Sequence, residues 1–413
     1  MEPLSLAIPS GSGSHPRPPS LKSPMQTKQA NFRYVRSGTS TVIVDPETGH
    51  ELQPHADLWF KDGSVICQAE RTLFRVHISQ LSRHSALFRD IFQLPQPARS
   101  RSRSLSSVDT LDDTRAVLEE CENCPVVFLH DGADDVAHFL VALYDGPNFG
   151  NNDQEDFQVV SGILRLSTKY IVDSLRAKAL AHLCIAWPST LKGWDAREDV
   201  ARTFEMETSA SGGHFYPSPI AVINLSREVS APCLLPAAFY DLCRYSYAQI
   251  YEPADDEPLF QAPSSPTTYS TLSPLDMQRL ALGKEAAQHN ITALIQTMGH
   301  AQTHIRHAQP HTHVRKSSSG GVCVSAAACR KDFSELVDLA TQHYLFDRER
   351  GHCDPLYVSE ELGQLKSAEF SECKACAKSL ETWAAREREK MWKMIPIWFR
   401  LESPPVEGSP RVV

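Results

Sequence analysis

The stretch FRVHISQLSRHSALFRDIF, residues 74–92, decides how the first part of the chain folds. It begins inside TLFRVH (72–77), a short run of apolar and β-branched residues that predicts a strand. After His77, apolar or small side chains recur at spacings of three and four residues, which predicts one helical face. These are Leu81, Ser85, Phe88 and Ile91 or Phe92. His77 therefore stands where a strand passes into a helix.

Two more strands are predicted upstream, in ADLWF (56–60) and SVICQAE (64–70). Asp62-Gly63 between them is a two-residue turn signal, so we expect the two strands to form a hairpin.

Downstream, PVVFLH (125–130) predicts a strand and DDVAHFLVALYDG (134–146) a helix closed by a glycine. Two apolar stripes within 151–190 predict a pair of helices, and helical patterns dominate from 191 to 401. The order of strands, helix, strand, helix and helix pair indicates an α+β fold followed by a mainly helical C-terminal region.

The order of particular residues in this region resembles the BTB (POZ) domain. The matching segments are HADLWF, FRVHISQLSRHSALFRDIF and PVVFLHDGADDVAHFLVALYDG, within a domain placed at 51–150. The resemblance rests on Asp57, Phe74, His77, Leu81, Ser85, Phe88, Leu140, Leu143 and Tyr144. PSTLKGWDAR (188–197) and the tryptophan-rich MWKMIPIWFRL (391–401) more narrowly resemble BTB proteins abundant in mushroom-forming fungi.

The resemblance gives His77 a structural role in the dimer-facing region, with Asp57 as a candidate polar partner. The alternative for His77 is a general base, which requires a nucleophile or a substrate pocket. The sequence has no Gly-x-Ser-x-Gly motif, P-loop, Rossmann glycine pattern or HExxH. We therefore expect a non-enzymatic protein without a cofactor, which forms homodimers as the family implies.

The resemblance also suggests what such a dimer would bind. The helix pair at 151–190 stands where cullin-recruiting BTB proteins carry extra helices, and Leu118 and Glu120 could supply their hydrophobic-x-glutamate contact. The chain would then be a substrate adaptor for a cullin-type ubiquitin ligase. The alternative is a transcription-associated scaffold that binds a co-repressor.

Composition limits the remaining possibilities. A net charge of −9 disfavours a nucleic-acid-binding surface, and no run of 18 or more apolar residues exists, so we expect no membrane partner. Eleven cysteines without a secretory signal favour the reducing cytoplasm or nucleus. Residues 1–50 are expected to be a disordered tail, 96–123 a polar insertion, and 252–274 and 308–321 disordered loops.

Two groups of residues could bind a metal ion. Cys373 and Cys376 form a C-x-x-C within a predicted helix at 367–395 that ends at Pro396. Zinc would require further ligands, for which the possibilities are Cys323, Cys329, His343, His352 and Cys353. We expect instead two thiols beside a helix face. The second group, His300, His304, His307, His311 and His313, has helical spacing, but Gly299 and Pro310 favour a solvated segment.

Overall fold

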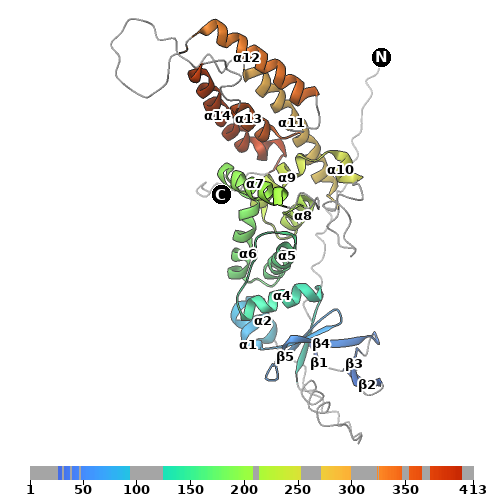
Figure 1. Ribbon diagram of the computed structural model, residues 1–413. Helices are drawn as coiled ribbons and strands as arrows, with labels where there is room; N and C mark the ends of the chain where they lie inside the picture. The colour runs from blue at the N-terminus through green and yellow to red at the C-terminus, as the bar shows by residue number, and fades with distance from the viewer. Residues whose placement is uncertain are drawn as a thin grey trace, which may run out of the picture. The chain divides into compact units, whose positions relative to one another are not determined.

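The structure is a computed structural model, and it describes residues 27–29, 32–37, 40–45, 48–93, 124–207, 214–252, 271–298, 323, 325–346, 353–364 and 373–401. The chain forms two compact units, residues 1–133 and 134–413. The described strands all belong to the first unit, and the described part of the second is helical (Figure 1). The expectation of a mixed α and β fold with a mainly helical C-terminal region is confirmed.

The described strands of the first unit form one sheet in the order β1-β7-β5-β6-β4-β3-β2. At its centre β5 pairs antiparallel with β6 and parallel with β7, and β4 pairs parallel with β6. The central strands are almost entirely buried because apolar side chains fill both faces. The strands are β1 (Thr27–Gln29), β2 (Arg33–Ser37), β3 (Ser40–Val44), β4 (Glu51–Trp59), β5 (Val65–Ala69), β6 (Thr72–Val76) and β7 (Pro125–Leu129).

The expected hairpin between β4 and β5 is wrong, because β6 lies between these two strands. The observed hairpin joins β5 to β6 and turns at Glu70, which has a positive φ of 51°. Asp62-Gly63 does reverse the chain, and the Gly63 N–H donates to the Phe60 carbonyl at 3.0 Å. A Cβ on Gly63 would lie 2.8 Å from the Arg75 Cγ, so a close approach to β6 requires glycine there.

Strands also occur in the segment that was expected to be a disordered tail. β1, β2 and β3 all lie before residue 50, and β3 pairs antiparallel with both β2 and β4. Ile43 of β3 is buried in an apolar cluster with Leu52 and Leu73, and Phe32 packs against it. The prediction of a disordered tail over residues 1–50 rested on the Pro-, Ser- and Gly-rich composition further upstream. The burial of Ile43 instead makes β3 part of the folded sheet.

The predicted helix after His77 is present but divided in two. α1 (Ile78–His84) and α2 (Ala86–Gln93) are separated by Ser85, whose backbone is extended. The Ser85 hydroxyl accepts a hydrogen bond from the Phe88 N–H at 3.1 Å, as an N-cap does. Leu81 and Phe88 are fully buried, as their spacing predicts.

The second unit begins with the predicted helix α4 (Ala133–Tyr144) and the helix pair α5 (Gln154–Lys169) and α6 (Asp173–Ala186). The remaining helices pack in sequence-adjacent pairs and around the long α11 (Figure 1). They are α7 (Leu191–Glu207), α8 (Pro219–Glu228), η1 (Pro232–Leu234), α9 (Leu235–Cys243), α10 (Tyr247–Tyr251), α11 (Pro274–Met298), α12 (Ala326–Thr341), the π-helical turn η3 (Gln342–Phe346), α13 (Pro355–Gln364) and α14 (Lys374–Trp398).

The last helix differs from its prediction at its C-terminal end. α14 does not stop at Pro396 but continues to Trp398, and Phe399 caps it by donating to the Ile395 carbonyl at 3.3 Å. Burial of Trp398 and Phe399 offsets the hydrogen bond that proline cannot donate. Among the described helices, none is both long and apolar enough to cross a membrane.

Candidate functional site

His77 occupies the joint between β6 and α1 that the sequence predicts. Its carbonyl accepts from the N–H groups of Gln80 and Leu81 at 3.1 and 3.2 Å, which starts the helix. Its ring lies 5.3 Å from the ring of Phe60, and its Nε2 lies 3.2 Å from the Asp62 Oδ2. These contacts connect the turn before β5 to the start of α1.

The expected partner of His77 is wrong, because the carboxylate beside the imidazole belongs to Asp62 and not to Asp57. Asp57 lies on β4 with its side chain exposed, and its N–H donates to the His55 Nδ1 at 3.2 Å. Alternation along β4 turns Asp57 toward solvent while Leu58 is buried. The hydrogen bond from His77 lowers the pKa of Asp62.

The other residues of the BTB resemblance divide between the two units. Phe74, Leu81, Ser85 and Phe88 are fully buried in the first unit. In the second unit, Leu140 and Leu143 on α4 are buried and Tyr144 is half-buried. The candidate cullin contacts Leu118 and Glu120, and the histidines from His300 to His313, lie outside the described residues.

The two segments that carried the narrower resemblance meet in the second unit. The Trp392 indole N–H donates to the Ser189 carbonyl at 3.0 Å, and the Trp392 and Trp194 rings lie 5.8 Å apart. Arg388, one turn before Trp392, binds Asp195 at 2.7 Å. Residues 188–197 and the C-terminal part of α14 are therefore parts of one packed cluster, although Asp195 and Arg388 are 193 positions apart in the sequence.

Next to that cluster, Arg197 is buried among aromatic rings. Its guanidinium carbon lies 4.4 to 4.8 Å from the ring centres of Trp187, Trp194 and Tyr216, the geometry of cation–π contacts. Its Nη2 binds the Asp241 carboxylate at 2.7 Å. The side chains of both partners are less than 5% exposed, so this is a buried ion pair.

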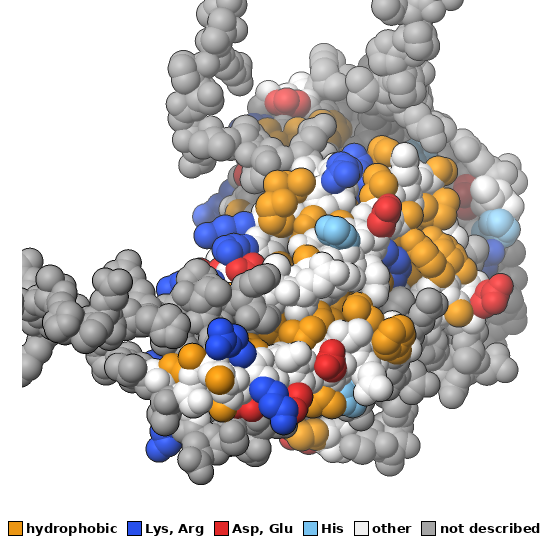
Figure 2. Space-filling view, turned by 90° about the horizontal axis from the view of Figure 1, so that it is seen from above, with side chains coloured by type: hydrophobic (Ala, Val, Ile, Leu, Met, Phe, Trp, Pro, Cys, Tyr) orange, Lys and Arg blue, Asp and Glu red, His pale blue; other side chains and the backbone are white. Residues whose placement is uncertain are grey.

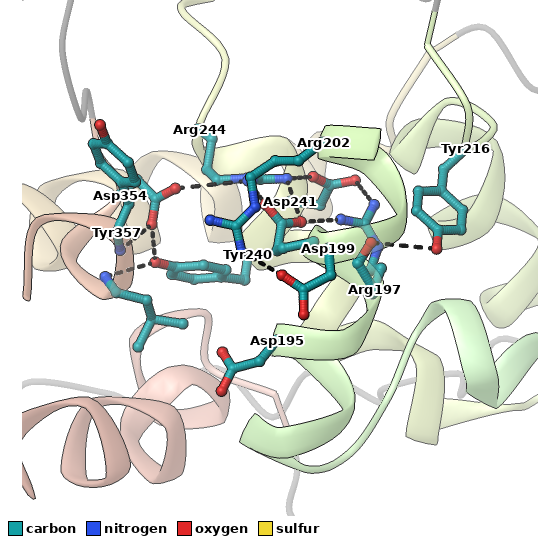
Figure 3. Close-up of polar contacts among 12 residues, drawn as sticks. Asp195, Arg197, Asp199, Arg202, Tyr216, Tyr240, Asp241, Arg244, Asp354 and Tyr357 are labelled. Atoms are coloured by element: carbon teal, nitrogen blue, oxygen red, sulfur yellow. Dashed lines mark hydrogen bonds and ion pairs between the residues drawn. The ribbon is translucent and has the colours of Figure 1, made fainter. Parts of the chain in front are cut away.

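The ion pair extends into a network that joins three helices (Figure 3). Arg244, just after α9, binds Asp241 and also the Glu198 carboxylate of α7 at 2.7 Å. Asp354, just before α13, lies 3.6 Å from Arg244 and accepts from the Tyr240 hydroxyl at 2.6 Å. The network thus fixes α7, α9 and α13 to one another.

Electrostatics within the network favour its charged state. Burial works against the charge of Asp241, but the guanidinium groups of Arg197 and Arg244 hold its pKa below the usual value. Burial, together with Asp354, raises the pKa of Tyr240, which therefore stays a hydrogen-bond donor. A cavity of about 840 Å³ borders this network, and its wall includes the paired groups Arg197, Glu198, Asp241 and Arg244.

The predicted C-x-x-C motif lies at the beginning of α14 and not along its face. Cys373 is the N-cap residue and Cys376 lies in the first turn. Their thiols meet those of Cys323 and Cys329, so that the four sulfurs all lie within 4.8 Å of one another. The Cys323 Sγ lies 3.5 Å from the Cys329 Sγ and 3.8 Å from the Cys376 Sγ. We call this group the four-cysteine cluster.

The four-cysteine cluster corrects the expectation of two thiols beside a helix face. Cys353 lies elsewhere, with its Sγ 3.7 Å from the Gln288 Oε1, and His343 is on η3; neither belongs to the cluster. Burial is the main cause that raises the pKa of Cys329 to about 11 and that of Cys376 above its usual range.

A signal for the missing pair was present in the sequence. Cys329 starts the apolar stripe of α12 that continues at Phe333, Leu336 and Ala340. Cys376 likewise starts the stripe of α14. Cys329 and Cys376 are thus the first buried residues of α12 and α14, and their thiols meet at the N-terminal ends of these two helices.

Comparison with known proteins gives no family for this chain. No protein-family model matches it, and no curated protein matches it significantly.

Proposed function

We propose that the chain is a non-enzymatic protein–protein interaction module of the BTB type, which associates with itself and works in the cytoplasm or nucleus. The order of elements supports this reading. β4 to β6, then α1 and α2, then β7, α4 and the pair α5 and α6 follow one another as the resemblance implies. The observations that support the proposal most directly are the central strand order β7-β5-β6 and the buried positions of α1 and α2.

The proposed self-association surface lies on α1 and α2. Ile78, Leu87 and Phe92 are half-buried apolar side chains on these two helices, next to the joint at His77. Apolar surface of this kind gains free energy when a second copy covers it, at about 25 cal/mol per Å² of area removed from water. His77 and Asp62 would position the start of α1 within that surface.

The finer role that we propose is that of a substrate adaptor for a cullin-type ubiquitin ligase. In chain order α5 and α6 follow α4, which is where the resemblance puts the extra helices of such adaptors, and the helices from α7 onward would select the substrate. The network around Arg197 supports this role because it holds α7, α9 and α13 together, as a substrate-binding platform would require. The alternative partner is a transcriptional co-repressor.

Affinity purification of the full-length chain from its native cells, followed by mass spectrometry, tests these partners. The proposal predicts a cullin in stoichiometric amount, and a bait carrying Leu81→Asp should lose it because the buried charge unfolds the first unit. A bait carrying Ser79→Asp, an exposed position on the same helix, should keep it.

Other results would separate the alternatives. Chromatin factors in place of a cullin would favour the co-repressor scaffold and exclude the adaptor role. Recovery of the chain with no second copy and no stable partner would contradict the interaction module as a whole.

A further inference from the structure

The four-cysteine cluster brings together two pairs of residues from distant parts of the second unit. Cys323 lies two residues before the N-cap of α12 and Cys329 is the fourth residue of that helix, whereas Cys373 is the N-cap of α14 and Cys376 its third residue. Cys329, Cys373 and Cys376 are buried, and Cys323 is half-buried. The four sulfurs therefore face one small volume that is largely shielded from water.

The sulfur separations fit a single tetrahedral ion. Four sulfurs bound at about 2.3 Å to a zinc ion in tetrahedral geometry lie about 3.8 Å from one another. The Cys323 sulfur lies 3.5 Å from the Cys329 sulfur and 3.8 Å from the Cys376 sulfur, and all four sulfurs lie within 4.8 Å of one another, in agreement with that value. A polynuclear iron–sulfur core would hold its ligands further apart because its own atoms stand between them.

The surrounding backbone favours negative charge at this point. Cys329 belongs to the first turn of α12, and Cys373 and Cys376 belong to the N-cap and first turn of α14, where the helix dipole favours negative charge. The exposed side chains of Arg330 and Lys374 follow ligand residues directly in the chain. A zinc ion with four thiolates carries a net charge of −2, which helix N-termini stabilise.

We propose that Cys323, Cys329, Cys373 and Cys376 bind one structural zinc ion that joins the N-terminus of α12 to that of α14. Binding converts the four thiols to thiolates and releases four protons, and no oxidation or reduction takes place. All four positions are filled by protein sulfur, which is the closed coordination of a structural site and leaves no place for a substrate.

The zinc ion would stabilise the position of α12, which packs against few other helices. α12 packs mainly against α11, through the stripe that includes Phe333 and Leu336. α14 packs against α11 and α13. A zinc ion between the two N-termini would close this arrangement, so metal binding would contribute directly to the stability of the C-terminal helices.

Metal analysis of the purified full-length chain tests the site. We expect one equivalent of zinc per chain from inductively coupled plasma mass spectrometry. Cys329→Ser and Cys376→Ser should each lose most of that zinc. Cys233→Ser is the matched control, because the Cys233 and Cys184 sulfurs lie 3.9 Å apart but form only a pair, and this variant should retain one equivalent.

A second measurement on the wild-type chain does not depend on whether the variants fold. After removal of metal by a chelator, Co²⁺ should bind with one equivalent and give the visible absorption bands of a tetrahedral cobalt thiolate, which added Zn²⁺ should abolish. Zinc should also restore the thermal midpoint that the chelator lowers.

Several outcomes would overturn the proposal. They are a folded chain without zinc and without a cobalt thiolate spectrum, iron in place of zinc, disulfides within the cluster, or equal loss of zinc in Cys233→Ser. A failure to bind cullin would leave this site untouched, because the zinc assignment does not rest on the proposed partner.

Discussion

Leu81, in the middle of α1, is among the fully buried residues of the first unit. It is completely inaccessible to solvent, and it lies one turn after His77, which orders the beginning of the helix. A substitution at this position therefore tests whether α1 packs as described.

Leu81→Asp should destabilise the first unit by about 3 kcal/mol or more, because the carboxylate would be buried without a partner. Chemical denaturation of the full-length chain, followed by circular dichroism, measures the change. Ser79→Asp on the exposed side of the same helix should change stability little. Equal stability of the two variants would mean that α1 is wrongly placed.

Asp156 makes the stability of the second unit depend on pH. Burial opposes its charge, but the N–H groups of Gly150 and Asn152 and the His182 imidazole at 2.7 Å lower its pKa below the usual value for an aspartate. A lowered carboxyl pKa stabilises the folded state above the unfolded-state pKa, and this contribution is lost as pH falls through the folded-state pKa.

Replacing Asp156 by Asn should therefore lower stability at neutral pH and make less difference under acidic conditions below pH 3.8. Urea denaturation of wild type and Asp156→Asn across this range is the measurement. Asp153→Asn is the control, since Asn also accepts the hydrogen bond that this N-cap receives from the Asp156 N–H. A constant difference between Asp156→Asn and wild type at every pH would contradict the assignment.

At the scale of helices, α11 requires a glycine where it passes the C-terminal end of α14. A Cβ on Gly283 would lie 1.9 Å from the Phe399 ring, and Phe399 is fully buried. Alanine normally stabilises a helix by about 1 kcal/mol relative to glycine. Gly283→Ala should instead destabilise the chain, because the ring cannot keep its position.

Thermal denaturation measures this effect. Gly132→Ala is the comparison, since nothing lies within 4 Å of a Cβ there, and it should cost much less. A higher melting temperature for Gly283→Ala than for wild type would mean that the two helices do not meet at this point.

The buried ion pair between α7 and α9 should contribute far more to the free energy of unfolding than the more exposed ion pair between α7 and α14. Arg197→Met leaves Asp241 with Arg244 as its remaining partner, and we expect a loss of about 3 kcal/mol. Asp195→Asn weakens the pair with Arg388, in which Asp195 is 40% exposed, and should cost about 0–1 kcal/mol. Equal costs in denaturation experiments would contradict the description of the network.

Local patterns predicted most elements of the chain, because strand and helix periodicities depend on near neighbours in sequence. β6, β7, α4 and the buried positions of α1 and α2 are examples. The parallel pairing of β4 with β6 could not be predicted in this way. A turn signal such as Asp62-Gly63 shows that the chain reverses, but not which strand the next one joins.

The candidate sites show the same limit. The C-x-x-C pair was visible in the sequence, but its convergence with Cys323 and Cys329 depends on how α12 and α14 pack in three dimensions. The contact between Trp392 and the Ser189 carbonyl is likewise a property of the packed unit. His77 was predicted as a joint, and only the geometry identified Asp62 as its partner.

For the whole molecule, the central claim is that the chain associates with itself through α1 and α2. The direct test is the mass of the full-length chain in solution, measured by light scattering over a range of concentrations. We predict twice the chain mass of 46.0 kDa for wild type and for Ser79→Glu, and a shift toward the single-chain mass for a folded Leu87→Glu variant. A wild-type chain that remains at 46.0 kDa at every concentration would contradict the claim.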